Sequence, residues 1–324
     1  MALFEQFLGA TAGFIGSTND ICNDYDLSSN PNIVANCLSE GLPAGFTATS
    51  SVQVLQAGGA AAGLSAETST NFTTGIILQP TLPTGWGDVS FAVDFVEIEV
   101  DNGVDQVGTS YILSQCYGSS AAIFAAKQGY CAFVSRNSGT NSLTVTNGYV
   151  NIATDILHGI DYNLRYSNDF GPGRLLFNAS VTNYITRESQ LFPTDPTYNT
   201  VGSLNDPEYS ATASVSYSWD NWRVRYGVEW IDAMSDEDLY AEQNGGFSLE
   251  GYGIDASVDA YFLHSASAQW STDELTITAG VRNLFNEDPP TATGYWVGGV
   301  GNAPLYSGYD FVGRSVFINV SKTF

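Results

Sequence analysis

Apolar and small polar residues alternate strictly along residues 209–219. Tyr, Ala, Val and Trp fill one set of alternate positions, and Ser and Thr fill the other. Because successive side chains of a β-strand point to opposite faces, a period of two predicts a strand with one apolar and one small polar face. The alternation resumes along 222–230, after the turn residues at 220–221. The two segments therefore predict a β-hairpin.

The same period recurs in other parts of the chain. The other predicted strands lie at 72–79, 89–100, 150–166, 175–182, 259–271, 275–282 and 314–324. The register of the second of these slips at residues 95–96, which predicts a β-bulge. The sequence thus predicts an all-β protein with about nine strands.

The connections between the predicted strands are of two kinds, which alternate along the chain. Short turns fall near 80–86, 167–173, 220–221 and 271–274, and long polar stretches fall near 106–146, 190–207, 235–258 and 287–313. This alternation is typical of outer-membrane barrels, which have tight periplasmic turns and long extracellular loops. We therefore expect an antiparallel transmembrane β-barrel.

Aromatic residues near the strand ends bear on the choice between a barrel and a soluble protein. A tilted strand of this length rises roughly 25 Å along a barrel axis, which matches the apolar band of outer-membrane barrels. Tyr209 and Trp230 would then mark one membrane interface, and Tyr217, Trp219 and Trp222 the other. The alternative is a secreted β-sandwich, either an adhesin or a structural module, in which the apolar face would form the core.

Composition narrows the class of protein further. The chain has 324 residues with 10 basic and 34 acidic side chains, which gives a formal net charge of −24. This balance excludes a nucleic-acid-binding protein, which needs clustered Lys and Arg. Only 14% of the residues are charged and 33 are Gly, a mixture that disfavours helices. No run of about 20 apolar residues occurs, which excludes a membrane-spanning helix.

The four cysteines form two pairs with the same spacing. Cys22 and Cys37 form one pair, Cys116 and Cys131 the other, and each pair lies in a region rich in Gly, Ser and Asn. Two local disulfides are the simplest interpretation, each worth about 3 kcal/mol in the loop-entropy model. Disulfides imply an oxidising compartment. Zinc is the alternative, but the C-x-x-C spacing of zinc sites is absent.

The sequence carries no recognisable catalytic, metal-binding or cofactor-binding motif. The patterns G-x-x-x-x-G-K and H-E-x-x-H are absent. The two histidines, His158 and His264, lie within predicted strands, and we interpret both as structural or interfacial. The acidic run at 232–242 lacks the ligand spacing of a calcium loop, so a solvated surface is the simpler interpretation. We expect neither an enzyme nor a bound cofactor or metal.

The C-terminal part of the chain resembles a known family. Residues 275–290 read LTITAGVRNLFNEDPP and residues 309–314 read YDFVGR. With the terminal Phe324, these segments are similar to the C-terminal end of TonB-dependent outer-membrane receptors. Further matches lie at 64–69, 93–103 and 159–161. The first of these departs from the family's usual Asn-Pro-x-Leu-Lys-Pro-Glu, because Ala replaces the Asn-Pro part and the later Pro.

The last strand ends on an aromatic residue, Phe324. It resembles the C-terminal signal by which outer-membrane proteins are recognised for insertion, so the resemblance implies a role for Phe324 as a membrane-insertion signal. Lys322 departs from the usual apolar choice, although its side chain could extend to the interface.

The resemblance implies a place for this chain within a larger receptor. In the family a barrel of 22 strands encloses an N-terminal plug, which carries the TonB box. We find neither plug nor box, and expect a fragment in which 1–66 is an extracellular loop region with a disulfide and 67–324 is the C-terminal portion of the barrel.

The resemblance also implies a location, a function and partners. The implied location is the outer membrane of a Gram-negative bacterium, and the implied function is active uptake of an oligosaccharide, a siderophore or cobalamin. The paired-cysteine loops and aromatic surface favour carbohydrate. The expected partners are outer-membrane lipid, the barrel assembly machinery and a small-molecule or oligosaccharide ligand. The TonB complex would act only through a plug that this chain lacks.

Charged residues on the polar faces of the strands are the candidate lumen-facing residues. These are Arg165, Arg223, Arg225, Glu229 and Arg282. Charges in a lumen can pair across strands or with a plug, or can line a substrate path.

Aromatic residues of the last long loop form a candidate ligand surface. They are Tyr295, Trp296, Tyr306 and Tyr309. Aromatic rings offer large contact area at binding sites. Packing against a neighbouring loop is the alternative.

Overall fold

The computed structural model describes residues 7, 9–56, 64–190, 196–293, 302–304 and 308–323, apart from the side chains at 152 and 153. The chain divides into two compact units. The disulfide unit comprises Met1–Ser69, Val100–Thr154 and Gln190–Asp195, and the sheet unit comprises Thr70–Glu99, Asp155–Ser189 and Pro196–Phe324. The predicted boundary between residues 66 and 67 differs from this division, because the long connection after residue 100 joins the N-terminal segment.

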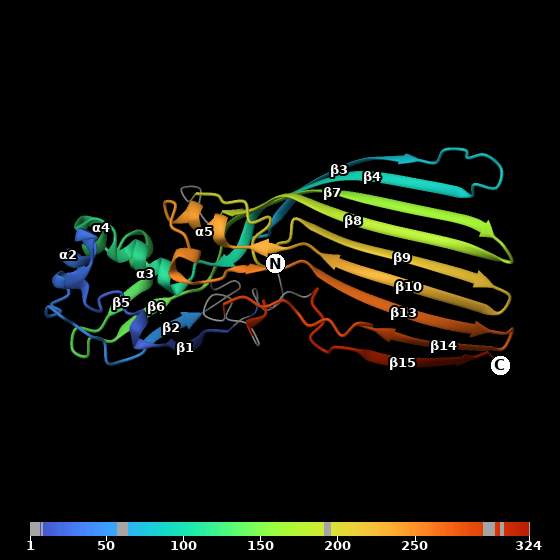
Figure 1. Ribbon diagram of the computed structural model, residues 1–324. Coiled ribbons are helices and arrows are strands. Elements are labelled where there is room, and N and C mark those ends of the chain that lie inside the picture. Colours follow the sequence, from blue (N-terminus) through green and yellow to red (C-terminus); the bar gives the residue numbers. More distant parts are fainter. Residues whose placement is uncertain are drawn as a thin grey trace. The chain divides into compact units, whose positions relative to one another are not determined.

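The sheet unit is built on nine strands (Figure 1). They are β3 (Thr68–Leu78), β4 (Asp88–Gln106), β7 (Tyr149–Phe170), β8 (Gly173–Gln190), β9 (Tyr209–Trp219), β10 (Trp222–Ile231), β13 (Tyr261–Ser271), β14 (Leu275–Arg282) and β15 (Ser315–Lys322). Their order is β15-β14-β13-β10-β9-β8-β7-β4-β3, so each strand lies beside its neighbours in the chain. The prediction of about nine strands with antiparallel pairing is confirmed. Within the described residues, β3 and β15 do not pair and the sheet is open.

The predicted hairpin at β9 and β10 is confirmed with its turn. The pairing runs from Trp219 opposite Trp222 to Ser210 opposite Ile231. Asp220, the first turn residue, has φ 44°, a left-handed conformation that Asp tolerates in tight hairpin turns. The turn fixes the register, and the register sets which side chains share a face.

The disulfide unit has a small sheet of its own. Its strands are β1 (Thr11–Ile15), β2 (Val52–Gln56), β5 (Val134–Arg136) and β6 (Leu143–Thr146), in the order β1-β2-β6-β5. β2 and β6 pair in parallel, although about ninety residues of chain separate them. Neither strand is long enough to show a clear alternation of apolar and polar residues, so the sequence pattern could not reveal this pairing.

Three short helices accompany that sheet. They are α2 (Pro31–Ser39), α3 (Thr109–Tyr117) and α4 (Ala121–Ala125). α2 begins with a good cap, because the side chain of Asn30 accepts a hydrogen bond from the backbone N–H of Asn32 and Pro31 occupies the first turn. The fold is therefore mostly β, and the helices lie in stretches that the alternation pattern left unassigned.

The remaining elements are short. They are the 3-10 helices η1 (Ser17–Asn19), η2 (Tyr25–Leu27), η4 (Gly129–Phe133) and η5 (Glu250–Tyr252), the helix α5 (Glu237–Gln243), and the strands β11 (Met234–Ser235) and β12 (Ser257–Val258). No helix among the described residues has the length and apolar character needed to cross a bilayer.

The core of the disulfide unit forms around its cystines. Cys22 is joined to Cys37 and Cys116 to Cys131, and all four residues are buried. Apolar residues from two segments of the unit, Met1–Ser69 and Val100–Thr154, pack around them, including Val52, Leu113 and Val145. The predicted pairing is confirmed. The zinc alternative is wrong, because both pairs are closed as disulfides and leave no thiolate for a metal.

Candidate functional site

Strand pairing places small polar side chains together on one face of the sheet, which we call the polar face. Ser214 on β9 lies opposite Gly227 on β10, which lies opposite Ser265 on β13. Asn178 on β8 completes this row. Residues directly opposite in an antiparallel pair share a face, so the alternation seen along each strand becomes a continuous polar surface across strands.

A hollow of about 430 Å³ opens on the polar face. Its polar lining includes Ser90, Asn163, Arg165, Asn178, Ser180, Thr212, Ser214, Arg225, Glu229 and Ser265. These residues come from β4, β7, β8, β9, β10 and β13. Three of the predicted lumen-facing residues, Arg165, Arg225 and Glu229, are thus brought to one site.

The other two predicted charges lie on the same face outside the hollow. Arg223 is opposite Ser218, and its Nε donates to the Ser218 hydroxyl at 3.0 Å. Arg282 is opposite Ser265. Sequence reasoning missed Arg174, which also lies opposite Ser218 and begins the same kind of alternation on β8. Whether this face looks into a lumen stays a prediction.

The polar face carries five arginines, namely Arg165, Arg174, Arg223, Arg225 and Arg282. None of them has a carboxylate partner within 4 Å among the described residues. They make up half of the basic side chains of a chain whose net charge is −24. Their side chains are exposed. The polar face therefore carries five arginines that form no ion pair within the described residues, together with the carboxylates of Glu229 and Asp161.

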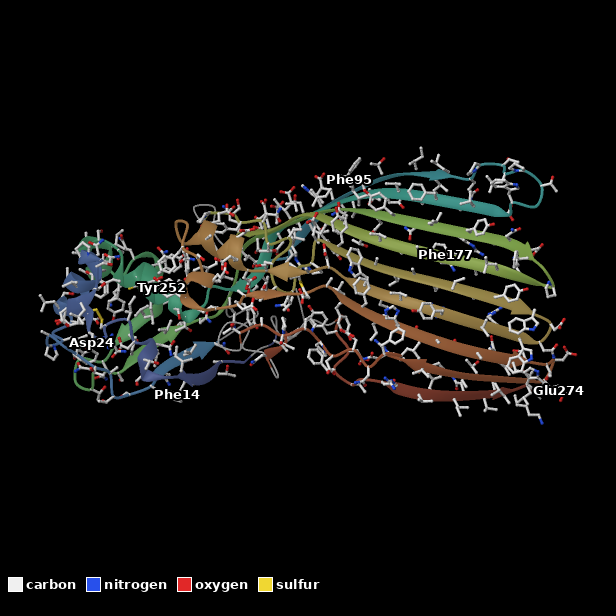
Figure 2. The ribbon with its side chains drawn as sticks, in the orientation of Figure 1. Phe14, Asp24, Phe95, Phe177, Tyr252 and Glu274 are labelled. Carbon is white, nitrogen blue, oxygen red and sulfur yellow. A yellow bond between two sulfur atoms is a disulfide. The ribbon has the colours of Figure 1, made fainter. Side chains whose placement is uncertain are left out.

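The opposite face of the sheet is apolar and uncovered. Val215, Trp222, Val224 and Tyr226 are each at least 36% exposed. Phe177 on β8, labelled in Figure 2, lies opposite Val215 and shares this face. A soluble protein rarely exposes so continuous an apolar surface, whereas a membrane barrel must.

Aromatic rings on the apolar face gather at both ends of the hairpin. Trp230 stacks on Tyr209 at 6.4 Å and on Phe262 at 6.3 Å between ring centroids. Tyr217 stacks on Trp219 at 5.4 Å near the turn. This is the arrangement that two aromatic girdles require.

The candidate ligand loop is only partly described. Tyr295, Trp296 and Tyr306 lie outside the described residues. Tyr309 is 6% exposed and packs edge-on against Tyr261 at 5.2 Å. Its ring supplies packing in an apolar cluster, and a role in ligand binding stays a prediction.

Three other residues were named from the sequence, namely Phe324, His264 and His158. Phe324 lies outside the described residues, so its role in membrane insertion stays a prediction. The His264 Nδ1 lies 2.6 Å from the Tyr226 hydroxyl. The ring of His158 lies 6.2 Å from that of Phe95. Both histidines therefore contact aromatic side chains of neighbouring strands.

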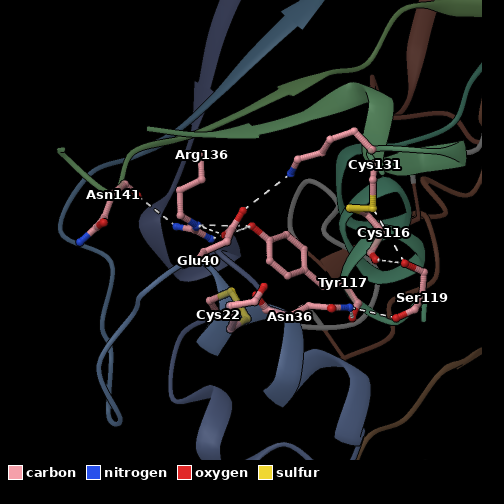
Figure 3. Close-up of polar contacts among 12 residues, drawn as sticks. Cys22, Asn36, Glu40, Cys116, Tyr117, Ser119, Cys131, Arg136 and Asn141 are labelled. Carbon is pink, nitrogen blue, oxygen red and sulfur yellow. Dashed lines mark hydrogen bonds and ion pairs between the residues drawn. A yellow bond between two sulfur atoms is a disulfide. The ribbon is translucent and has the colours of Figure 1, made fainter. Parts of the chain in front are cut away.

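A buried ionic cluster joins the segments Met1–Ser69 and Val100–Thr154 of the disulfide unit (Figure 3). Arg136 donates from both terminal nitrogens to the Asp20 carboxylate at 2.7 Å, and from Nε to Glu40 at 2.7 Å. The Tyr117 hydroxyl donates to the same Glu40 oxygen at 2.7 Å. The side chains of Arg136 and Asp20 are each only 2% exposed. No local sequence signal marks this cluster, because Asp20 and Arg136 lie 116 residues apart.

Burial and the neighbouring charges change the ionisation of the cluster. Burial raises the pKa of Tyr117 far above its usual range, so its hydroxyl stays protonated and can donate. Burial alone would lower the pKa of Arg136, but the hydrogen bonds to Asp20 and the nearby negative charge raise it overall. Arg136 is therefore a permanent cation that satisfies two carboxylates.

Comparison with known proteins agrees with this geometry. The model of the family described as "TonB dependent receptor-like, beta-barrel" matches residues 34–284, more than half of the chain. The chain belongs to this family. TonB-dependent receptors sit in the outer membrane of Gram-negative bacteria and are transporters, not enzymes. The alternative of a secreted β-sandwich is therefore wrong.

A solved receptor shows the same fold over part of its chain. The ferric enterobactin receptor PfeA of Pseudomonas aeruginosa aligns with 16% identity and a TM-score of 0.51, over 84% of this chain and 33% of the receptor. The siderophore receptor PirA of Acinetobacter baumannii aligns with 16% identity and a TM-score of 0.48, over 88% and 35%. The chain spans about a third of the length of these receptors. No curated protein matches it.

Proposed function

We propose that this chain forms the C-terminal portion of the barrel wall of a TonB-dependent receptor. The apolar face would meet outer-membrane lipid and the polar face would enclose the lumen. The whole receptor would take up a scarce small molecule, of the oligosaccharide, siderophore or cobalamin class, and would be energised by the TonB complex through a plug outside this chain. The barrel assembly machinery would insert it, with Phe324 as the signal.

One observation carries this proposal. Side chains of opposite chemistry alternate along the strands, and among the described residues no second sheet covers the apolar side. Large apolar residues at that side would be unfavourable in water by about 25 cal/mol per Å² of exposed apolar surface. Lipid removes that cost, because it is itself apolar. The polar face needs water or polar groups instead, as a barrel lumen provides.

Two neighbouring residues of β9 allow this proposal to be tested. Val215 lies on the apolar face and Ser216 on the polar face of β9. The native cysteines are all in disulfides, so a single introduced thiol can be labelled alone. In lipid vesicles, Ser216→Cys should react with a water-soluble maleimide, and Val215→Cys should be protected until the chain is unfolded. Equal reactivity of the two variants would contradict the proposal.

A further inference from the structure

The connection between β10 and β13 carries two exposed aromatic rings that stack on each other. The ring centroids of Phe247 and Tyr252 lie 4.9 Å apart, and the ring planes make an angle of 21°. Phe247 is 46% exposed, and Tyr252, labelled in Figure 2, is 68% exposed. Exposed aromatic surface is unfavourable in water and is enriched at protein interfaces. We call these two residues the aromatic pair.

The segment that carries the aromatic pair is held in place by its own contacts. The Glu237 carboxylate accepts hydrogen bonds from the backbone N–H groups of Leu249 and Glu250 at 3.0 and 3.3 Å. These bonds join α5 to η5, and the Leu249 side chain is buried. The pair is therefore presented on an ordered segment, which lowers the entropy cost of binding.

The neighbouring connections of the sheet contact this segment and leave the aromatic pair exposed. The Ser235 N–H donates to the Gly202 carbonyl, which lies between β8 and β9. The Thr293 N–H, which lies between β14 and β15, donates to the Asp255 carbonyl. The two connections that flank the segment along the strand order are thus already packed against it.

The segment 232–259, which contains the aromatic pair, is strongly acidic. It holds eight Asp and Glu residues and neither Lys nor Arg. Glu242 and Glu250 are exposed, and neither has a cationic side chain within 4 Å in the described part of the chain. The aromatic pair therefore lies in a field of negative charge.

The basic residues of this chain are committed elsewhere or too few to match the segment. Five of the ten are the arginines of the polar face, and Lys127, Arg136 and Arg187 form ion pairs with other carboxylates. Arg314 and Lys322 are the two that remain, against eight carboxylates. A partner with complementary charge would therefore be another molecule.

We propose that the segment 232–259 docks an arginine-rich segment of another protein. Guanidinium groups stack on aromatic rings and pair with carboxylates, so they would satisfy the aromatic pair together with Glu242 and Glu250. A hollow of about 590 Å³, which Glu250 helps to line, leaves room for a further side chain. Eight carboxylates spread along the segment match a chain with several cations better than a small polyamine. The inference goes beyond the proposed function and does not depend on which medium the sheet faces.

Peptides of six Arg-Gly or six Lys-Gly repeats are matched probes, because they differ only in the cationic group. Their binding to the full chain in nonionic detergent can be measured by fluorescence anisotropy. We expect the Arg peptide to bind roughly threefold more tightly than the Lys peptide, since guanidinium stacks better on rings. Phe247→Leu with Tyr252→Leu keeps the net charge and the apolar character but removes the rings. This variant should bind the Arg peptide roughly fivefold to thirtyfold more weakly.

A second pair of variants tests the carboxylates against the general charge of the protein. Glu242→Gln with Glu250→Gln should weaken binding of the Arg peptide roughly fivefold. Asp273→Asn with Glu274→Gln is the control, because it removes the same charge from exposed residues at the turn between β13 and β14. The control should change the affinity by less than about twofold. An equal loss in the control would assign binding to the overall negative field and overturn the proposal.

Three further results would also overturn it. A wild-type chain that does not bind the Arg peptide has no such docking surface. Unchanged binding by the double Leu variant would show that the rings take no part. Displacement of the peptide by spermine at equal charge would assign the segment to small polyamines. Far-UV circular dichroism reports whether each variant keeps its sheet, and the labelling of Val215→Cys and Ser216→Cys tests the proposed function separately.

Discussion

Arg136 joins the two segments of the disulfide unit, and its removal should be strongly destabilising. In Arg136→Gln, the Asp20 carboxylate, only 2% exposed, would lose its bidentate cation. Breaking a buried ion pair by removing one partner costs about 3–5 kcal/mol. Glu40 would be less affected, because it keeps the Tyr117 hydroxyl and lies 3.8 Å from the Lys127 ammonium.

Hydrogen exchange of the backbone amides can measure this loss where it occurs. Amides in α2 and α3 should exchange through opening of the disulfide unit, since both helices contribute to its core. The expected loss of stability corresponds to faster exchange by roughly a hundredfold to a few thousandfold. Mass spectrometry of peptides covering 31–39 and 109–117 gives the rates.

Two further variants test the physical reason. Arg187 pairs with Asp206, but its side chain is 52% exposed. Arg187→Gln should therefore change exchange nearby by no more than about 1 kcal/mol. The double variant Arg136→Met with Asp20→Leu should recover much of the loss, because it removes the buried Asp20 carboxylate that Arg136→Gln leaves without its cation. If Arg136→Gln changed exchange by less than about tenfold, the ionic cluster would not be holding the unit together.

Three other predictions follow from the same geometry. Replacing both Cys116 and Cys131 by Ser should destabilise the disulfide unit by about 3 kcal/mol, measurable by denaturant unfolding. The pKa of Tyr117 is raised by burial, so the unfolded chain loses this proton before the folded one. Stability should therefore be unaffected by this group below about pH 10 and should fall as the pH rises beyond it, as unfolding at graded alkaline pH would reveal. Val215→Arg on the apolar face should cost about 2–4 kcal/mol in a bilayer, against far less for Ser216→Arg, and urea midpoints in vesicles should show the difference.

The barrel strands could be predicted because their chemistry is local. The alternation along 209–219 and 222–230 shows which residues lie on the apolar face and which on the polar face. A tight turn fixes the register between the two strands. Predicted and observed ends agree within a few residues for β9, β10 and β14. The shared face of Arg225 and Glu229 follows from the same period of two. Their meeting with Arg165 does not, because it depends on the pairing of strands far apart in the chain.

The disulfide unit was harder to foresee for a related reason. Its helices have only nine residues or fewer, too short for a clear helical period. A signal was present at α2, where Asn30 and Pro31 form a recognisable helix start. The parallel pairing of β2 with β6 and the contact of Asp20 with Arg136 had no such signal, since both join distant segments.

The contacts between those two segments limit which sequence changes this protein can tolerate. A chimaera that took only the stretch around Arg136 from another receptor would replace the ion-pair partner of Asp20. It would also replace β6, the strand that pairs with β2. Viable chimaeras should therefore carry both stretches from one parent. Substitutions in either stretch should likewise be accompanied by compensating substitutions in the other.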